Sequence, residues 1–324
     1  MYNIYNKEED NMKKRNKTIL GSSILLVTAI LWGTTFVAQR MGSDYVSPFT
    51  YNFYRGLISA CVLYVIYIIK RLTTKRKEEE TEENLQPKKS KKYLIIMMIL
   101  VGIGLFMGQS LQQIGITLTH SAAKAGFISS TYLIFVPIIE IFFHKKVKGY
   151  IWICLILALV GSFLIAAKEE FKIELGDVVV LLSAVGFALQ IIFVSKVVGE
   201  VDAVLVSAIQ FTVAFILSFI CKVIFEGFDY ESVKQGFFAI LYAAIFSGCI
   251  AFTLQIVGQK YTPPTIASVI MSSECVFSLI FSMIVLHEKL SLLEWIGSGV
   301  IVLAIILAQL DLKRKEDIQK ESIE

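Results

Sequence analysis

Two ionisable side chains in this sequence lie deep inside long apolar stretches. Glu274 is about ten residues into the stretch 264–286, and Arg55 is about nine residues into the stretch 46–69. A charge at the bilayer centre costs about 2.5–3.5 kcal/mol on insertion scales, so each group is expected to face a cavity or a partner. The carboxylate could contact a solute or carry a proton, and the guanidinium could attract an anionic group. The structural alternatives are a hydrogen-bonded packing role for Glu274 and a brace or snorkelling role for Arg55.

Polar and aromatic side chains accompany these charges in the other apolar stretches. Amide, hydroxyl and indole groups can line a solute cavity, and they also bond one membrane helix to another. Besides Glu274 and Arg55, the candidate cavity residues are Trp32, Thr35, Gln112, Ser129, Ser130, Tyr132, Gln190, Gln255, Ser272 and Ser273. Gln39 and Gln109 share this character. Glu140 lies one turn from a helix end and is expected to snorkel to the interface.

The sequence contains none of the common motifs for hydrolysis or for nucleotide-driven transport. There is no Gly-Lys-Ser loop, no H-E-x-x-H and no G-x-S-x-G. The cysteines lie in apolar runs without a C-x-x-C pair, so they are interpreted as small apolar side chains rather than metal ligands or disulfides. These cysteines are Cys61, Cys154, Cys221, Cys249 and Cys275. We therefore expect a protein that is not an enzyme and that needs no cofactor or metal.

The composition of the 324-residue chain is typical of a membrane protein. Hydrophobic residues make up 56% and charged residues 18%, with a mean hydropathy of +0.68, whereas a soluble domain has roughly 45–50% apolar residues. The net charge is +4, but the basic residues gather beside apolar runs and indicate topology rather than a nucleic-acid partner. The uncharged run 19–39 is longer than a signal-peptide core and is interpreted as a first, uncleaved membrane helix.

Ten apolar runs approach the length of about 20 residues that crosses the hydrocarbon core. They are 19–39, 46–69, 93–117, 122–143, 149–167, 176–195, 202–221, 236–259, 264–286 and 290–310. We therefore expect an all-α integral membrane protein with ten transmembrane helices, and Pro137 to interrupt the fourth of them. The connecting segments hold 23 Lys and Arg on one side and 6 on the other, which predicts that both termini are cytoplasmic. The charged segment 70–92 is expected to be a solvated cytoplasmic loop.

The second half of the chain repeats the first. At an offset of 143 residues, identical residues align as Leu111 with Leu254, Gln112 with Gln255, Gly115 with Gly258, Ser129 with Ser272, His144 with His287 and Trp152 with Trp295. At an offset of about 155, the first two helices align with the sixth and seventh, with Trp32 near Phe187 and Arg55 near Gln210. Apolar composition alone would not align Gln, Gly, His and Trp together.

Each repeat contains five helices, and an odd number inverts the second copy in the membrane. Inverted repeats are the architecture of many secondary transporters, whose solute site lies near the midplane. We expect a cytoplasmic segment 1–18, a first repeat 19–168, a second repeat 176–310 and a cytoplasmic tail 311–324. A repeat retained only for packing is the alternative.

Several motifs resemble those of EamA-type transporters of the drug/metabolite transporter superfamily. They are Trp32-Gly33-Thr34 in the first helix, Pro48 and Arg55 in the second, and Ser273–Phe277 leading to His287–Leu290. The last pair is similar to the family pattern Leu-Glu-x-Val-Phe … Gly-Glu-Arg-Leu. The resemblance covers about residues 19–310 and implies ten helices in two repeats and export of a small solute. Lys145 and His287 depart from the Glu and Gly that are common at these positions in the family.

We expect a secondary transporter of the cell membrane that moves a small metabolite, an amino acid or a drug-like compound by alternating access. Its partners would be the small-molecule substrate and the lipid bilayer. Protons are the candidate coupling ion, with Glu274 as candidate carrier, and the substrate gradient alone is the alternative driving force. An uncoupled facilitator or channel is one alternative and would need a continuous polar path. A membrane assembly protein without transport is the other and would carry no flux. The sequence does not set the oligomeric state.

Overall fold

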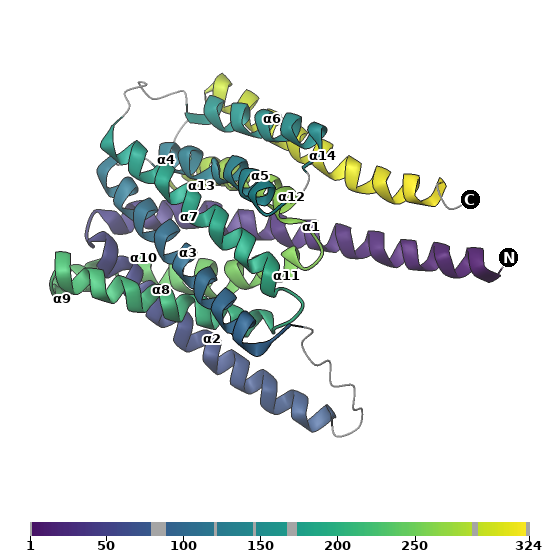
Figure 1. The fold of residues 1–324 in the computed structure, drawn as a ribbon. Helices are drawn as coiled ribbons and strands as arrows, with labels where there is room; N and C mark the ends of the chain where they lie inside the picture. The colour runs from purple at the N-terminus through teal and green to yellow at the C-terminus, as the bar shows by residue number, and fades with distance from the viewer. Residues whose placement is uncertain are drawn as a thin grey trace.

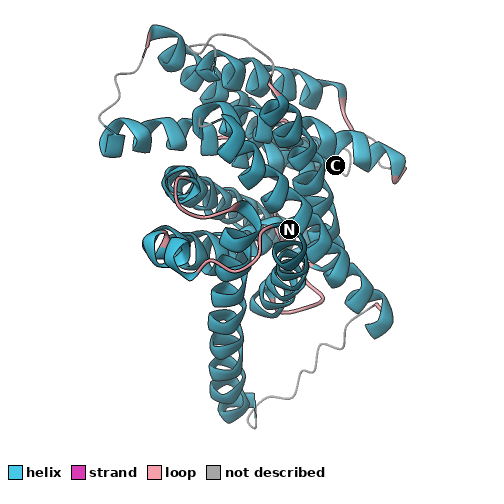
Figure 2. Cartoon of the chain, turned by 90° about the vertical axis from the view of Figure 1, so that its left-hand side faces the viewer, coloured by secondary structure: helices cyan, strands magenta, loops and turns pink. Residues whose placement is uncertain are grey.

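The computed structural model describes residues 2–78, 89–119, 122–144, 147–166, 174–286 and 291–321. The regular elements of this described part are all helices, which run through one bundle, and the first and last helices extend from the same end of it (Figure 1). A view turned by 90° shows the helices joined by loops, with no strand in the described part (Figure 2). The expectation of an all-α protein is confirmed.

The helices follow one another along the chain with short connections. Those of the first half are α1 (Tyr2–Ser43), α2 (Pro48–Glu78), α3 (Lys91–Thr119), α4 (Ala122–Ser130), α5 (Tyr132–Phe142) and α6 (Gly149–Ala166). Those of the second half are α7 (Leu175–Val197), α8 (Ala203–Phe225), α9 (Tyr230–Gln235), α10 (Phe237–Tyr242), the π-helix η1 (Ala243–Ala251), α11 (Phe252–Gln259), α12 (Pro264–Met271), α13 (Glu274–Leu286) and α14 (Leu292–Glu321). The middle of the charged segment, residues 79–88, lies outside the described residues.

Eight helical segments in the described part are long and apolar enough to cross a membrane. The predicted runs 149–167 and 290–310 correspond to two shorter apolar helices, Gly149–Ile165 and Leu292–Ala308. These two pack against each other, because Gly161 and Gly297 let their backbones approach: a Cβ on either glycine would lie within 2.7 Å of the other's carbonyl oxygen. The chain is therefore a multi-pass membrane protein.

Two of the predicted spans are each broken in the middle. In the first, Ser130 Oγ donates to Phe127 O at 2.7 Å and Thr131 Oγ1 donates to Ile128 O at 2.6 Å, and α5 starts at the next residue. Hydroxyls that bond a carbonyl one turn back compete with the backbone and bend helices. The predicted interruption at Pro137 is not the break: α5 continues through Pro137, and the helix breaks six residues earlier.

The second break is built in the same way. Ser272 Oγ donates to Val269 O and Ser273 Oγ to Ile270 O, each at 2.7 Å, and α13 begins at Glu274. The serines at both breaks align at the 143-residue offset. Two membrane-embedded helices are thus discontinuous at matching positions.

Close helix contacts also occur in matching pairs. A Cβ on Gly115 of α3 would lie 2.1 Å from Val180 Cγ2 and 3.0 Å from Gly176 O of α7. A Cβ on Gly258 of α11 would lie 2.7 Å from Leu25 Cγ and 3.1 Å from Gly21 O of α1. The two glycines are 143 residues apart and their partners are 155 apart. The same glycine contact therefore joins α3 to α7 and α11 to α1.

Polar contacts join α2 to α8 near both ends of α8. The Glu226 carboxylate, directly after α8, accepts hydrogen bonds from Ser47 Oγ at 2.8 Å and from Thr50 N at 2.7 Å at the start of α2. At the opposite end Lys70 Nζ lies 2.5 Å from Asp202 Oδ2, the carboxylate that also caps α8. These contacts fix the direction of α2, which carries Arg55.

Candidate substrate-binding site

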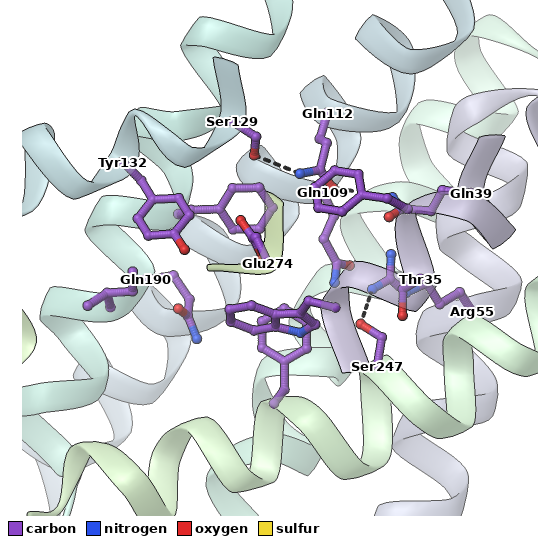
Figure 3. A pocket seen from close by; sticks show the side chains of 15 residues that line it. Thr35, Gln39, Arg55, Gln109, Gln112, Ser129, Tyr132, Gln190, Ser247 and Glu274 are labelled. Carbon is purple, nitrogen blue, oxygen red and sulfur yellow. Dashed lines mark hydrogen bonds between the residues drawn. The ribbon is translucent and has the colours of Figure 1, made fainter. Parts of the chain in front are cut away.

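A pocket lies where the two broken helices meet α1, α2, α3, α7 and the η1–α11 segment (Figure 3). Its cavity volume is about 30 Å³, room for about two water molecules at ~10–15 Å³ each. A metabolite therefore needs the surrounding helices to separate.

The pocket brings together eight of the twelve residues predicted from the sequence. Its lining includes Trp32, Thr35, Arg55, Gln112, Ser129, Tyr132, Gln190 and Glu274. Gln39 and Gln109, which share the same polar character, also line it. The residues come from seven helices spread over both halves of the chain, so the fold rather than local sequence assembles the site.

The other four predicted residues lie outside the lining. Gln255 contacts a lining residue instead: its Nε2 donates a hydrogen bond to Gln190 Oε1 at 2.9 Å. Ser130, Ser272 and Ser273 are buried, and their hydroxyls bond backbone carbonyls at the helix breaks. Their place in the fold is to shape the breaks that position Tyr132 and Glu274.

Five lining residues were not among the sequence candidates: Phe36, Phe187, Ile191, Ser247 and Phe252. The repeat offsets are a signal that points to three of them. Offset 155 pairs Trp32 with Phe187 and Phe36 with Ile191, and offset 143 pairs Gln109 with Phe252. Thr35 and Gln190 form a fourth such pair, so four pairs of matching positions meet in one pocket.

Glu274 is the first residue of α13, and its side chain is only 4% exposed. A carboxylate in the first turn is stabilised by the helix dipole. Tyr132, the first residue of α5, faces it (Figure 3). The N-terminal ends of two half-helices thus converge on one carboxylate and one phenol.

Arg55 lies on another side of the pocket and is 3% exposed. Its Nη2 donates to Ser247 Oγ at 2.7 Å, whereas Nε and Nη1 have no partner in the described part of the chain. Gln109 Nε2 and Trp32 Nε1 are likewise buried there without an acceptor. Because buried polar groups are nearly always hydrogen-bonded, this group of donors is suited to an anionic ligand.

The two opposite charges are held apart. Arg55 and Glu274 line the same pocket, but no salt bridge joins them within the described residues, and Figure 3 shows Arg55 beside Ser247 and Glu274 beside Tyr132. Aromatic rings line the same pocket: Trp32 and Phe252 have centroids 4.9 Å apart, and Tyr132 and Phe187 have centroids 6.5 Å apart. The arrangement suits a solute with an apolar body and separated charges of opposite sign.

Two clusters of glutamine amides flank the pocket. In the first, Gln39 Nε2 donates to Gln112 Oε1 at 3.2 Å, and Gln112 Nε2 donates to Ser129 Oγ at 2.7 Å. In the second, Gln190 Nε2 donates to Gln210 Oε1 at 3.1 Å and to Gln255 Oε1 at 3.2 Å. Gln112 and Gln255 occupy matching positions in the two halves.

One further sequence expectation is corrected by the structure. Glu140 does not snorkel: it is 6% exposed, and the Thr265 hydroxyl donates a hydrogen bond to its carboxylate. The described residues contain no group of three or more His, Cys, Asp and Glu side chains able to hold a metal ion.

The chain matches the EamA-like transporter family over residues 19–167 and 174–310. It therefore belongs to this family of membrane transporters. The last part of the motif that indicated it, His287–Leu290, lies outside the described residues.

Individual relatives agree with this assignment. An "Uncharacterized transporter" of Archaeoglobus fulgidus is 30% identical over 292 residues, covering 88% of this chain and 84% of the relative. "Uncharacterized transporter YoaV" of Bacillus subtilis is 25% identical over 306 residues, covering 93% of this chain and 99% of the relative. A solved structure described as "Crystal structure of protein" has a TM-score of 0.71 at 17% identity, covering 91% of this chain and 98% of that one, which shows a common fold.

Proposed function

We propose that this protein is a secondary transporter that moves a small solute carrying charges of both signs, such as an amino acid, by alternating access. The observation that carries the proposal is the central pocket, in which Arg55 and Glu274 are buried without pairing with each other. A buried charge is costly unless it is paired, so an unpaired cation and anion in one cavity are suited to a dipolar ligand.

The proposed architecture has ten transmembrane helices in two inverted five-helix repeats, 19–168 and 176–310. The equivalent glycine contacts, the equivalent helix breaks and the four matching residue pairs in the pocket support it. Helices α6 and α14 complete the count as the fifth helix of each repeat. The short segment 1–18 and the tail 311–324 are proposed to lie in the cytoplasm, since the basic residues favour that side, and the membrane is proposed to be the plasma membrane.

In this proposal each end of the solute has its own partner. A carboxylate binds the Arg55 guanidinium and the Gln109 and Trp32 donors, since charge-assisted hydrogen bonds are the strong ones. An ammonium group binds Glu274 and the Tyr132 hydroxyl. The rings of Phe187 and Phe252 pack on the apolar body of the solute.

The glutamine clusters are proposed to act as gates. Each cluster closes one side of the pocket with hydrogen bonds between neutral amides. Because the amides carry no charge, these bonds can break and re-form with other partners without leaving a buried charge unpaired. Separation of Gln39 from Gln112 opens one side, and separation of Gln190 from Gln255 opens the other. The breaks at Thr131 and at Ser272–Ser273 are where the half-helices can change their angle.

Glu274 is also the proposed site of proton coupling, because it is the carboxylate of the pocket and can carry a proton when no solute ammonium is present. The direction, export from the cell, follows the family resemblance. An uncoupled facilitator is the second candidate function, and its support is the continuity of the polar lining with both glutamine clusters.

Reconstitution into proteoliposomes tests the proposal. Labelled amino acids should enter by a saturable process, exchange against unlabelled amino acids inside, and enter faster when a proton gradient is imposed. Glu274→Gln should abolish the effect of the proton gradient, whereas Glu231→Gln, in the exposed helix α9, should not. Flux that neither saturates nor exchanges would favour the facilitator, and no flux of any solute would refute transport.

A further inference from the structure

One membrane helix contains a stretch of unusual backbone. Residues Ala243–Ala251 form a π-helix of nine residues, η1, between the α-helices α10 and α11. π-helices are rare, mostly occur as single-turn bulges, and are frequent at functional sites. A longer π-helix persists only where its surroundings favour it over the α-helix.

Helices α1 and α2 both pack against η1, and α2 contributes the hydrogen bonds near its centre. Ser247, in the middle of η1, accepts the hydrogen bond from Arg55 Nη2 at 2.7 Å. Ser59 Oγ, one turn further along α2, lies 3.0 Å from Ala244 O and 2.8 Å from Arg55 O. Gly248 makes the approach feasible, since a Cβ there would lie 2.0 Å from Ser59 Oγ. Side chains of α2 thus satisfy polar groups along η1.

The matching stretch in the first half of the chain has ordinary geometry. At an offset of 143, η1 corresponds to residues 100–108 of α3, which are α-helical. Ser247 corresponds to Gly104, and Arg55 corresponds to Gln210 at an offset of 155. The hydrogen bond between a guanidinium and a hydroxyl therefore has no equivalent on the other side of the pocket, and neither does the π-helix.

We infer that the Arg55–Ser247 hydrogen bond holds η1 in its π-helical form, and that an anionic group of the solute releases it by taking the Arg55 guanidinium. Ser247 is then a positioning residue. It holds Arg55 in the pocket, and loss of its hydrogen bond when solute binds changes the conformation of the α10–α11 helix. A π-helix has its hydrogen bonds from i to i+5 and a smaller rise than an α-helix, so release lengthens this helix and shifts α10 relative to α11. The second half of the inference rests on the proposed function.

The test measures the length of this helix. Nitroxides on p-acetylphenylalanine at positions 238 and 260, which flank η1, leave the native cysteines unchanged, and electron–electron double resonance gives the distance between them in nanodiscs. Ser247→Ala should lengthen the distance by at least ~1.5 Å, the rise of one α-helical residue. Ser247→Thr, which keeps the hydroxyl, and Ser183→Ala, a buried serine of α7 outside the pocket, should match the wild type.

Solute binding is tested in the same samples with an equimolar mixture of the twenty L-amino acids. The mixture should lengthen the wild-type distance and leave Ser247→Ala, which is already long, unchanged. A wild-type distance in Ser247→Ala would overturn the inference whatever the solute. A long distance in Ser247→Ala with no response of the wild type to amino acids would support the Arg55–Ser247 restraint and refute the proposed solute.

Discussion

The hydroxyl of Thr265 donates a hydrogen bond to the carboxylate of Glu140, and this bond joins the two broken helices on one side of the pocket. Glu140 lies near the end of α5 and Thr265 near the start of α12. The opposite halves, α4 and α13, meet where Cys275 Sγ donates to Gly126 O at 3.2 Å. The α5–α12 pair is thus joined by a hydrogen bond to a buried carboxylate, and the α4–α13 pair by a hydrogen bond from a thiol.

Removal of the Thr265 hydroxyl should weaken this contact. Thr265→Val deprives a buried carboxylate of a donor, which costs about 1–3 kcal/mol, so the midpoint of thermal unfolding in detergent should fall. Thr265→Ser retains the hydroxyl and should stay close to the wild type. Equal midpoints for the Val and Ser variants would show that the bond contributes nothing to stability.

The glycine contacts test the equivalence of the two halves. Gly115→Ala and Gly258→Ala each place a Cβ against a neighbouring side chain, Val180 or Leu25, and overpacking of this kind costs about 1–3 kcal/mol. Both variants should lower the unfolding midpoint by similar amounts. Gly299→Ala, with no atom within 4 Å of the added Cβ, should be neutral or stabilising because Ala favours the helix. A neutral result for only one of the two contact glycines would contradict the equivalence.

The fastening of α2 to α8 should depend on the charge of Glu226. Its carboxylate accepts four hydrogen bonds at the start of α2, from Ser47, Phe49 and Thr50. Glu226→Gln removes the charge and one of the two acceptor oxygens, and hydrogen bonds to charged groups contribute about 1.5–3 kcal/mol. We expect a lower unfolding midpoint than for Glu231→Gln, whose carboxylate is exposed. A midpoint no lower than that of Glu231→Gln would show that the Glu226 charge does not stabilise the position of α2.

Much of the helix layout follows from hydropathy, because burial in lipid demands continuous apolar runs. The run 93–117 became α3 and the run 202–221 became α8, each within a few residues. The breaks at Thr131 and Ser272–Ser273 were not predicted, because a run that stays apolar on average conceals a local loss of helix. There the cause is a bond from a hydroxyl to a carbonyl, which hydropathy does not measure.

The site was predictable where polarity stands out against an apolar background. Glu274, Arg55 and the glutamines are conspicuous in membrane spans for this reason. Phe187, Ile191 and Phe252 are not, since apolar residues in an apolar span carry no signal of their own, although the repeat offsets pair them with Trp32, Phe36 and Gln109. Ser247 had neither signal, because its counterpart is Gly104 and its partner Arg55 is distant in sequence.

The proposal that Arg55 and Glu274 hold opposite ends of one solute is tested most directly by competition in proteoliposomes. An amino acid is transported in the presence of its amine analogue, which lacks the carboxylate, or its acid analogue, which lacks the ammonium. Wild-type protein should prefer the intact amino acid over both by about tenfold or more, since a lost charge-assisted hydrogen bond costs about 1.5–3 kcal/mol. Arg55→Gln should lose only the preference over the amine, and Glu274→Gln only the preference over the acid. Equal loss of both preferences in each variant, or of neither, would contradict the assignment.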